Sequence, residues 1–269
     1  IAREKSYREQ YQRPDDMQTL RVRDVPVSTF SIDVDTGSYS NMRRWISQGQ
    51  LPPENAVRIE EFINYFDYDY ATPHDSSQPF SVATEIGVTP WNPATRLLRI
   101  GIQGYDLAES ALPSSNLVLL VDVSGSMQSP DKLPLLKQAL SLLSRKLDAN
   151  DTISIVVYAG ASGVVLDSAS GNRKADVIAA LELLEAGGST NGASGIRLAY
   201  RLAQQNFRKN GINRVILATD GDFNVGVAST DELIDMVERR RQSGIALTTL
   251  GFGTGNYNDY MLEQLADAG

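Results

Sequence analysis

The sequence contains no cysteine and one histidine among its 269 residues. Disulfides and thiolate metal sites are therefore excluded, and so is a zinc site that needs several histidines. His74 lies in a polar stretch typical of a loop, and no Gly-x-Ser-x-Gly motif accompanies it as it would in many serine hydrolases. The Gly-Lys-Ser or Gly-Lys-Thr of a Walker A loop is also absent. These absences leave little room for the common hydrolytic and nucleotide-binding chemistries.

Long hydrophobic runs and an excess of positive charge are missing as well. The longest apolar run, residues 117–121, ends at Asp122 and is far shorter than the roughly 20 residues that cross a bilayer. Lys and Arg number 25 against 33 Asp and Glu, which gives a net charge of -8. Because phosphate binding needs clustered basic residues, we expect no nucleic-acid partner, and we expect no transmembrane segment.

The first part of the chain predicts an arm followed by a small subdomain. Residues 1–26 are polar and have no sustained hydrophobic period, which is typical of a flexible arm or tether. Residues 27–112 predict an α+β subdomain, in which Trp45 and Trp91 are expected to serve in packing. Its expected elements are a strand at 28–35, helical faces at 39–46 and 59–66, and strands at 80–88 and 96–103.

Residues 113–269 show a different pattern, in which short apolar runs alternate with longer helical periods. Runs that are apolar throughout are typical of strands buried on both faces. The pattern predicts an α/β fold with a doubly wound, mostly parallel sheet and helices on both faces. The expected strands are 116–122, 152–158, 214–220 and 245–252.

Two of these strands end in polar side chains that suit a hard cation. One runs into Asp122, Ser124 and Ser126, and another runs into Asp220. Ligands bind outside the carboxyl ends of strands in open α/β sheets, and a glycine-rich loop with Thr190 reaches the same edge if the chain runs strand, helix, helix, strand there. Mg²⁺ prefers such oxygen ligands. Each segment alone also fits a turn or a helix N-cap, so the combination carries the hypothesis.

The segment from Asp122 to Met127, Thr190 in its glycine-rich loop, and residues 219–221 resemble the metal-ion-dependent adhesion site of von Willebrand factor type A domains. The resemblance implies that Ser124, Ser126 and Thr190 contact the metal directly or nearly so, and that Asp122 and Asp220 act mostly through water. It covers about residues 113–269. Such domains usually add a strand after the last helix, whereas this sequence stops at Gly269, so we expect the domain to be truncated before its last strand.

The segments 30–39 and 59–65 resemble the region that precedes this domain in bacterial YfbK-like envelope lipoproteins. That resemblance implies a bacterial protein of the cell envelope, held outside the cytoplasm by a lipid-modified residue upstream of the arm. An arm of 26 residues spans roughly 25–30 Å as a random coil. An arm of ordinary disorder in a cytosolic protein is the alternative.

We therefore expect a non-enzymatic adhesion or interaction module that binds an Asp or Glu of a partner protein through Mg²⁺, with Mn²⁺ or Ca²⁺ as alternative ions. A metal-dependent hydrolase or phosphatase is the second interpretation, although the site offers no general base. A scaffold whose metal only stabilises loops is the third. Three other, weaker motifs are interpreted as turns or helix caps. Asp33-x-Asp35 only partly matches phosphotransferases with an aspartyl nucleophile, the segment 220–224 only partly matches a calcium loop, and the glycine cluster 251–255 does not follow the first strand as a dinucleotide site requires.

Overall fold

The computed structural model describes the chain except for residues 1–8, 10, 12–18, 30–31, 33, 109–110, 190–191, 222–229 and 254–256. The chain forms two compact units: residues 13–112 make up one, and residues 113–269, with the described residues among the first twelve, make up the other. Within the described residues, no helix has the length and apolar character that crossing a bilayer requires.

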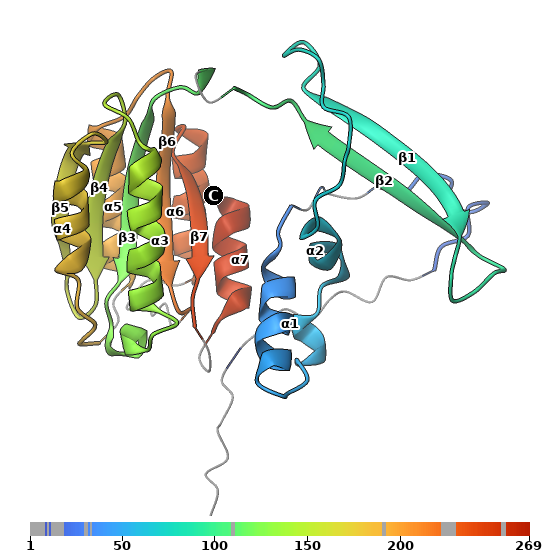
Figure 1. Cartoon of the computed structure of the whole chain (residues 1–269), viewed down its shortest axis with the longest axis horizontal. Helices are drawn as coiled ribbons and strands as arrows, with labels where there is room; N and C mark the ends of the chain where they lie inside the picture. The colour runs from blue at the N-terminus through green and yellow to red at the C-terminus, as the bar shows by residue number, and fades with distance from the viewer. Residues whose placement is uncertain are drawn as a thin grey trace, which may run out of the picture. The chain divides into compact units, whose positions relative to one another are not determined.

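The described part of the unit formed by residues 13–112 contains two short α-helices, a 3-10 helix (Glu54–Ala56) and a hairpin. Helices α1 (Gly37–Ser47) and α2 (Ile59–Asn64) are followed by strands β1 (Phe80–Val88) and β2 (Arg96–Gly104), which pair antiparallel over nine residue pairs (Figure 1). The α+β prediction for this region is confirmed. A strand at 28–35 is wrong for the positions that are described, since residues 28, 29, 32, 34 and 35 form no strand.

Helices α1 and α2 are joined by a buried polar network. The backbone N–H of Ser38 donates to Glu61 Oε2 at 2.7 Å, and Arg58 Nη1 lies 2.6 Å from Glu61 Oε1. Trp45 is 5% exposed and serves in packing as expected, whereas Trp91 is 77% exposed and lies outside the core of its own unit. Several apolar side chains of this unit are exposed, including Ile63 and Phe66 of the predicted α2 face. The helical spacing of apolar residues therefore predicted the two helices but not which of their faces are covered.

The second unit is a five-stranded sheet in the order β5-β4-β3-β6-β7 (Figure 1). Strands β3, β4, β6 and β7 are mutually parallel, and β5 runs antiparallel to β4 at the edge. The predicted doubly wound, mostly parallel α/β fold is confirmed. The strands are β3 (Ser115–Asp122), β4 (Thr152–Tyr158), β5 (Ser162–Ser170), β6 (Ile212–Thr219) and β7 (Ala246–Gly251).

Two helical layers cover the sheet. On one face α3 (Leu133–Lys146) and α4 (Lys174–Glu182) pack over Leu119, Val121 and other β3 and β4 side chains. On the other face α5 (Gly192–Gln205), α6 (Thr230–Gln242) and α7 (Asp259–Ala268) pack over Val118 and Leu120. Because successive strand side chains point to opposite faces, the continuous apolar run in β3 supplies both cores.

Candidate metal centre

The candidate site lies at the carboxyl ends of the two central strands. Asp122 is the last residue of β3, and Asp220 directly follows β6, its parallel neighbour. Both side chains are 0% exposed. The topology thus brings together the two carboxylates that the sequence predicted at this edge.

Three donors orient the carboxylate of Asp122. The backbone N–H of Ser124 donates to Oδ1 at 2.8 Å, while Thr219 Oγ1 and the Tyr158 hydroxyl donate to Oδ2 at 2.9 Å and 3.2 Å. The sequence did not single out Tyr158. The signal was available, because Tyr158 ends the neighbouring strand and pairs in register with Asp122.

Burial dominates the electrostatics of this carboxylate. It raises the pKa of Asp122 above its ordinary value, more than the hydrogen bonds from Ser124 and Thr219 lower it, and the charge of Asp220 raises it further. Burial and the charge of Asp122 also raise the pKa of Tyr158 well above its usual value, so this phenol keeps its proton and acts as a donor. The buried carboxylates therefore form an environment that a nearby cation would stabilise.

Two hydroxyls lie beside the carboxylates. Ser124 is buried, and its Oγ lies 3.0 Å from the Oγ of Ser126, whose residue is exposed. The short helical turn Gly125–Gln128 follows Ser124 and positions the second hydroxyl. The pair thus presents two oxygens at the solvent boundary of the site.

The glycine-rich loop reaches the same edge. The N–H of Gly187 donates to the carbonyl of Val123 at 2.7 Å, and the N–H of Gly125 donates to the carbonyl of Gly188 at 3.1 Å. The chain runs β5, α4, α5, β6 here, which is the strand, helix, helix, strand order that the prediction required. Thr190 itself lies outside the described residues.

The structure adds a side chain that the sequence did not reveal. Lys132, at the start of α3, places its Nζ 2.8 Å from Asp220 Oδ2, and the two side chains are 6% and 0% exposed. No local pattern marks Lys132, which is ten residues from Asp122 in the sequence. The part of the chain with described coordinates contains no group of three Asp, Glu, His or Cys that could hold a metal, so a centre here depends on hydroxyl ligands.

Apart from Asp220 itself, the weaker motifs supply no carboxylate or hydroxyl to this centre among the described residues. Asp33, Asp222 and Asn224 lie outside the described residues, and Asp35 is exposed. Gly251 ends β7, the last strand of the sheet, and Gly253 follows it, as expected for a turn.

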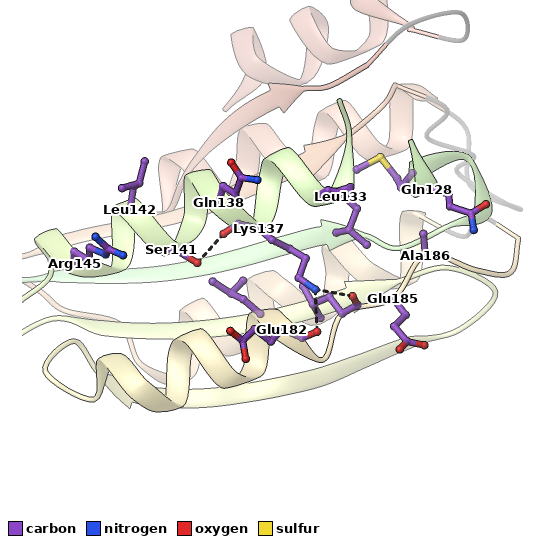
Figure 2. A pocket seen from close by; sticks show the side chains of 14 residues that line it. Gln128, Leu133, Lys137, Gln138, Ser141, Leu142, Arg145, Glu182, Glu185 and Ala186 are labelled. Atoms are coloured by element: carbon purple, nitrogen blue, oxygen red, sulfur yellow. Dashed lines mark hydrogen bonds between the residues drawn. The ribbon is translucent and has the colours of Figure 1, made fainter. Parts of the chain in front are cut away.

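A separate groove of about 820 Å³ lies between α3 and α4 (Figure 2). Met127 and Gln128, which directly follow Ser126, line one end of it. Lys137 extends across the groove, and its Nζ donates to the carbonyls of Glu182 and Leu184 at 2.9 Å and 3.1 Å. The groove is thus continuous with the serine turn of the candidate centre but holds none of its carboxylates.

The sheet order, and the Asp and Ser residues at the carboxyl ends of β3 and β6, are the features by which the class of this domain can be compared with known proteins. Residues 116–269 match the family model of the von Willebrand factor type A domain, and residues 5–99 match a second model described as von Willebrand factor. The chain belongs to the von Willebrand factor type A domain family. Domains of this family typically serve in interactions.

Relatives agree with this assignment. The chain is 47% identical over 265 residues to the YfbK protein of Escherichia coli K12, covering 96% of this chain and 46% of that protein. BatB of Bacteroides thetaiotaomicron has the same fold, with 19% identity, a TM-score of 0.50, and coverage of 58% of this chain and 87% of that chain. A manganese-loaded TRAP protein of Plasmodium vivax is similar at 21% identity and a TM-score of 0.46, over 57% and 62%. The chain spans about half the length of YfbK.

Proposed function

We propose that this protein is a metal-dependent protein-binding module. Its centre would consist of Asp122, Ser124, Ser126, Thr190 and Asp220, and its ion would be Mg²⁺, with Mn²⁺ or Ca²⁺ as alternatives. The observation that carries the proposal is the pair of hydroxyl oxygens 3.0 Å apart beside two buried carboxylates.

The two hydroxyls are hydrogen-bonded to each other at 3.0 Å, a separation that neighbouring ligands of a small ion would also have. Adjacent oxygens of an octahedron with bonds of 2.0–2.1 Å are about 2.8–3.0 Å apart, whereas bonds of 2.3–2.6 Å would separate them by about 3.3–3.7 Å. Ser124 and Ser126 therefore need little rearrangement to share a Mg²⁺ ion. Asp122, held by its three donors, would face the same position in a fixed orientation.

The ligand set favours an acidic partner. Hydroxyls carry no charge, so the two aspartates do little more than balance the charge of a divalent ion. The centre therefore has little excess negative charge that would repel a carboxylate. When bound, the ion would supply a coordination position for a carboxylate oxygen of a partner Asp or Glu. Ser126 is exposed and lies where such a side chain would approach.

The side chains around the site favour binding without catalysis, because none of those described is placed to act as a general base. A hydrolytic reaction needs a general base within reach of a water molecule. The Tyr158 phenol is held protonated, and Lys132 is paired with Asp220. Both aspartates are needed at the centre, which supports an interaction module over a hydrolase or phosphatase.

We also propose that the protein acts in the bacterial cell envelope, tethered outside the cytoplasm by a lipid. The support for this proposal is the resemblance of segments 30–39 and 59–65 to YfbK-like envelope lipoproteins. A module that captures acidic groups on other proteins would then work close to a membrane surface.

A pull-down tests the proposed function. Immobilised protein is incubated with envelope extract in Mg²⁺, in EDTA, and in EDTA followed by excess Mg²⁺. We expect specific proteins to be retained in Mg²⁺, lost in EDTA, and regained when Mg²⁺ is restored. A Ser126→Ala variant should fail to retain them, because its exposed hydroxyl matters to the centre and little to folding. Identical retention in all lanes would contradict the proposal.

A further inference from the structure

Lys132 is a buried lysine that the proposed centre does not explain. The residue is 5% exposed, and its Nζ forms a 2.8 Å ion pair with Oδ2 of Asp220. Lysine is rarely buried to this extent unless it is paired, because removing an ammonium from water is costly. The partner here is one of the two carboxylates assigned to the metal.

The fold provides a specific place for this side chain. Gly253, after β7, has a φ of 82°, and a Cβ at that position would overlap the aliphatic stem of Lys132. The backbone of Lys132 is fixed as well, since its N–H donates to the Ser129 carbonyl at 3.0 Å and its carbonyl accepts from the Leu136 N–H at 2.9 Å. The ammonium is therefore directed at Asp220 by the segment that begins α3 and by the segment that follows β7.

The Lys132–Asp220 ion pair lowers the negative charge of the centre. Asp122 and Asp220 contribute two negative charges, and Lys132 cancels one of them. A divalent ion would thus face a net charge of about -1 instead of -2, in a buried setting where screening by water is weak. The ion is held less tightly, and the filled centre keeps more positive charge for an incoming carboxylate.

We propose that Lys132 is a resident cation that competes with the divalent ion for Asp220 and so makes metal binding weak until an acidic ligand joins it. This inference rests on the proposed function, because it assigns a role to Lys132 at the same centre. A lysine that only stabilises the fold would leave the metal affinity unchanged or, by disordering Asp220 when removed, would make it weaker on removal.

The test is calorimetric titration of Mg²⁺ into wild type and Lys132→Gln. Glutamine is uncharged but retains an N–H donor for Asp220, so the fold is expected to persist. We expect Lys132→Gln to bind Mg²⁺ at least tenfold more tightly than wild type. Lys132→Arg, which retains the charge, should stay within about threefold of wild type.

Lys137→Gln is the matched control. It removes the same charge from the same helix, but Lys137 donates to main-chain carbonyls across the groove and not to a carboxylate of the centre (Figure 2). Its Mg²⁺ affinity should equal that of wild type. A rise equal to that of Lys132→Gln would overturn the specific role of Lys132 in favour of a general charge effect.

The acidic ligand gives a second readout. Sodium acetate, at constant ionic strength, should tighten Mg²⁺ binding by wild type more than it tightens binding by Lys132→Gln. Mg²⁺ binding by wild type with equal or weaker binding by Lys132→Gln would overturn this inference alone. An absence of Mg²⁺ binding by both proteins would overturn the metal centre itself, and this inference with it.

Discussion

At the scale of single residues, the centre depends on hydrogen bonds that join the ends of three different strands. Asp122 ends β3, Thr219 ends β6 and Tyr158 ends β4, and the last two donate to the first. A buried carboxylate without donors would carry a large desolvation cost, so these neighbours are part of what makes the site possible.

Tyr158→Phe tests this arrangement. The variant removes one donor to Asp122 Oδ2 and leaves the contacts from Thr219 and Ser124. We expect the free energy of unfolding to fall by about 1.5–3 kcal/mol, the net value of a hydrogen bond to a charged group. Urea denaturation measures it. Tyr260→Phe is the control, since that hydroxyl is on the exposed surface of α7, and a loss as large there would argue against a special role for Tyr158.

Residue types and their spacing could predict part of the centre and not the rest. Asp122, Ser124, Ser126 and Asp220 follow strands whose apolar runs are plain in the sequence, so their common edge could be inferred from topology. Lys132 could not, because its contact with Asp220 depends on the way α3 begins and on the space left by Gly253. Contacts of this kind arise from packing between elements that are distant in the sequence.

At the scale of elements, the hydrophobic pattern predicted the helices and strands whose buried residues recur with the period of a helix or form a continuous apolar run. Helix α3 and the central strands were found for this reason. Strand β5 was missed because residues 162–170 contain Gly163 and three serines and show no alternation of burial. The strand is also irregular, since Ser168 has a φ of 46° and its N–H donates to Ser154 Oγ at 3.0 Å.

The segment 28–35 was predicted as a strand that does not form, whereas β5 is a strand that was not predicted. It alternates as a strand would, yet the described residues within it form none, and Ile32 and Val34 are 67% and 77% exposed. Alternation indicates a strand only when a partner strand and a core are present, and neither can be read from a single segment.

Helix α3 offers a matched pair of substitutions. Leu140 is 2% exposed within the core between α3 and the sheet, whereas Leu142, two residues along, is 61% exposed. We expect Leu140→Ala to lower the free energy of unfolding by about 2–5 kcal/mol through loss of apolar burial and a residual cavity. Leu142→Ala should change it by no more than about 0.5 kcal/mol. Comparable losses in urea denaturation would mean that α3 does not pack as described.

At the scale of the whole molecule, similarity to a family model and to the YfbK protein establishes the family. The chain covers 46% of the YfbK protein, and the cellular role is therefore a proposal that rests on the resemblance of its first part. The net charge of -8 predicts that no nucleic acid is bound, and by itself it indicates nothing about which protein is bound.

The envelope proposal predicts a membrane-associated, lipid-modified protein. Cells that express the full-length gene are separated into cytosolic, periplasmic and membrane fractions, and the mature N-terminus is analysed by mass spectrometry. We expect the protein in the membrane fraction with a lipid on its first residue. Recovery only from the cytosol, with an unmodified N-terminus, would rule out the tether and leave the metal centre untouched.

The central claim is that Ser124, Ser126 and the two aspartates hold a Mg²⁺ ion, and calorimetric titration of Mg²⁺ into wild type and Ser126→Ala tests it most directly. Ser126 is exposed, so its loss should leave the fold intact, and Ser141→Ala, which removes a hydroxyl bonded to its own helix at the Lys137 carbonyl, is the matched control. We predict one Mg²⁺ per chain in wild type and Ser141→Ala, and at least about tenfold weaker binding in Ser126→Ala, since loss of even an outer partner of a metal ligand typically has an effect of that size. Equal affinity in all three proteins, or no binding by wild type even with sodium acetate present as the acidic ligand, would contradict the account.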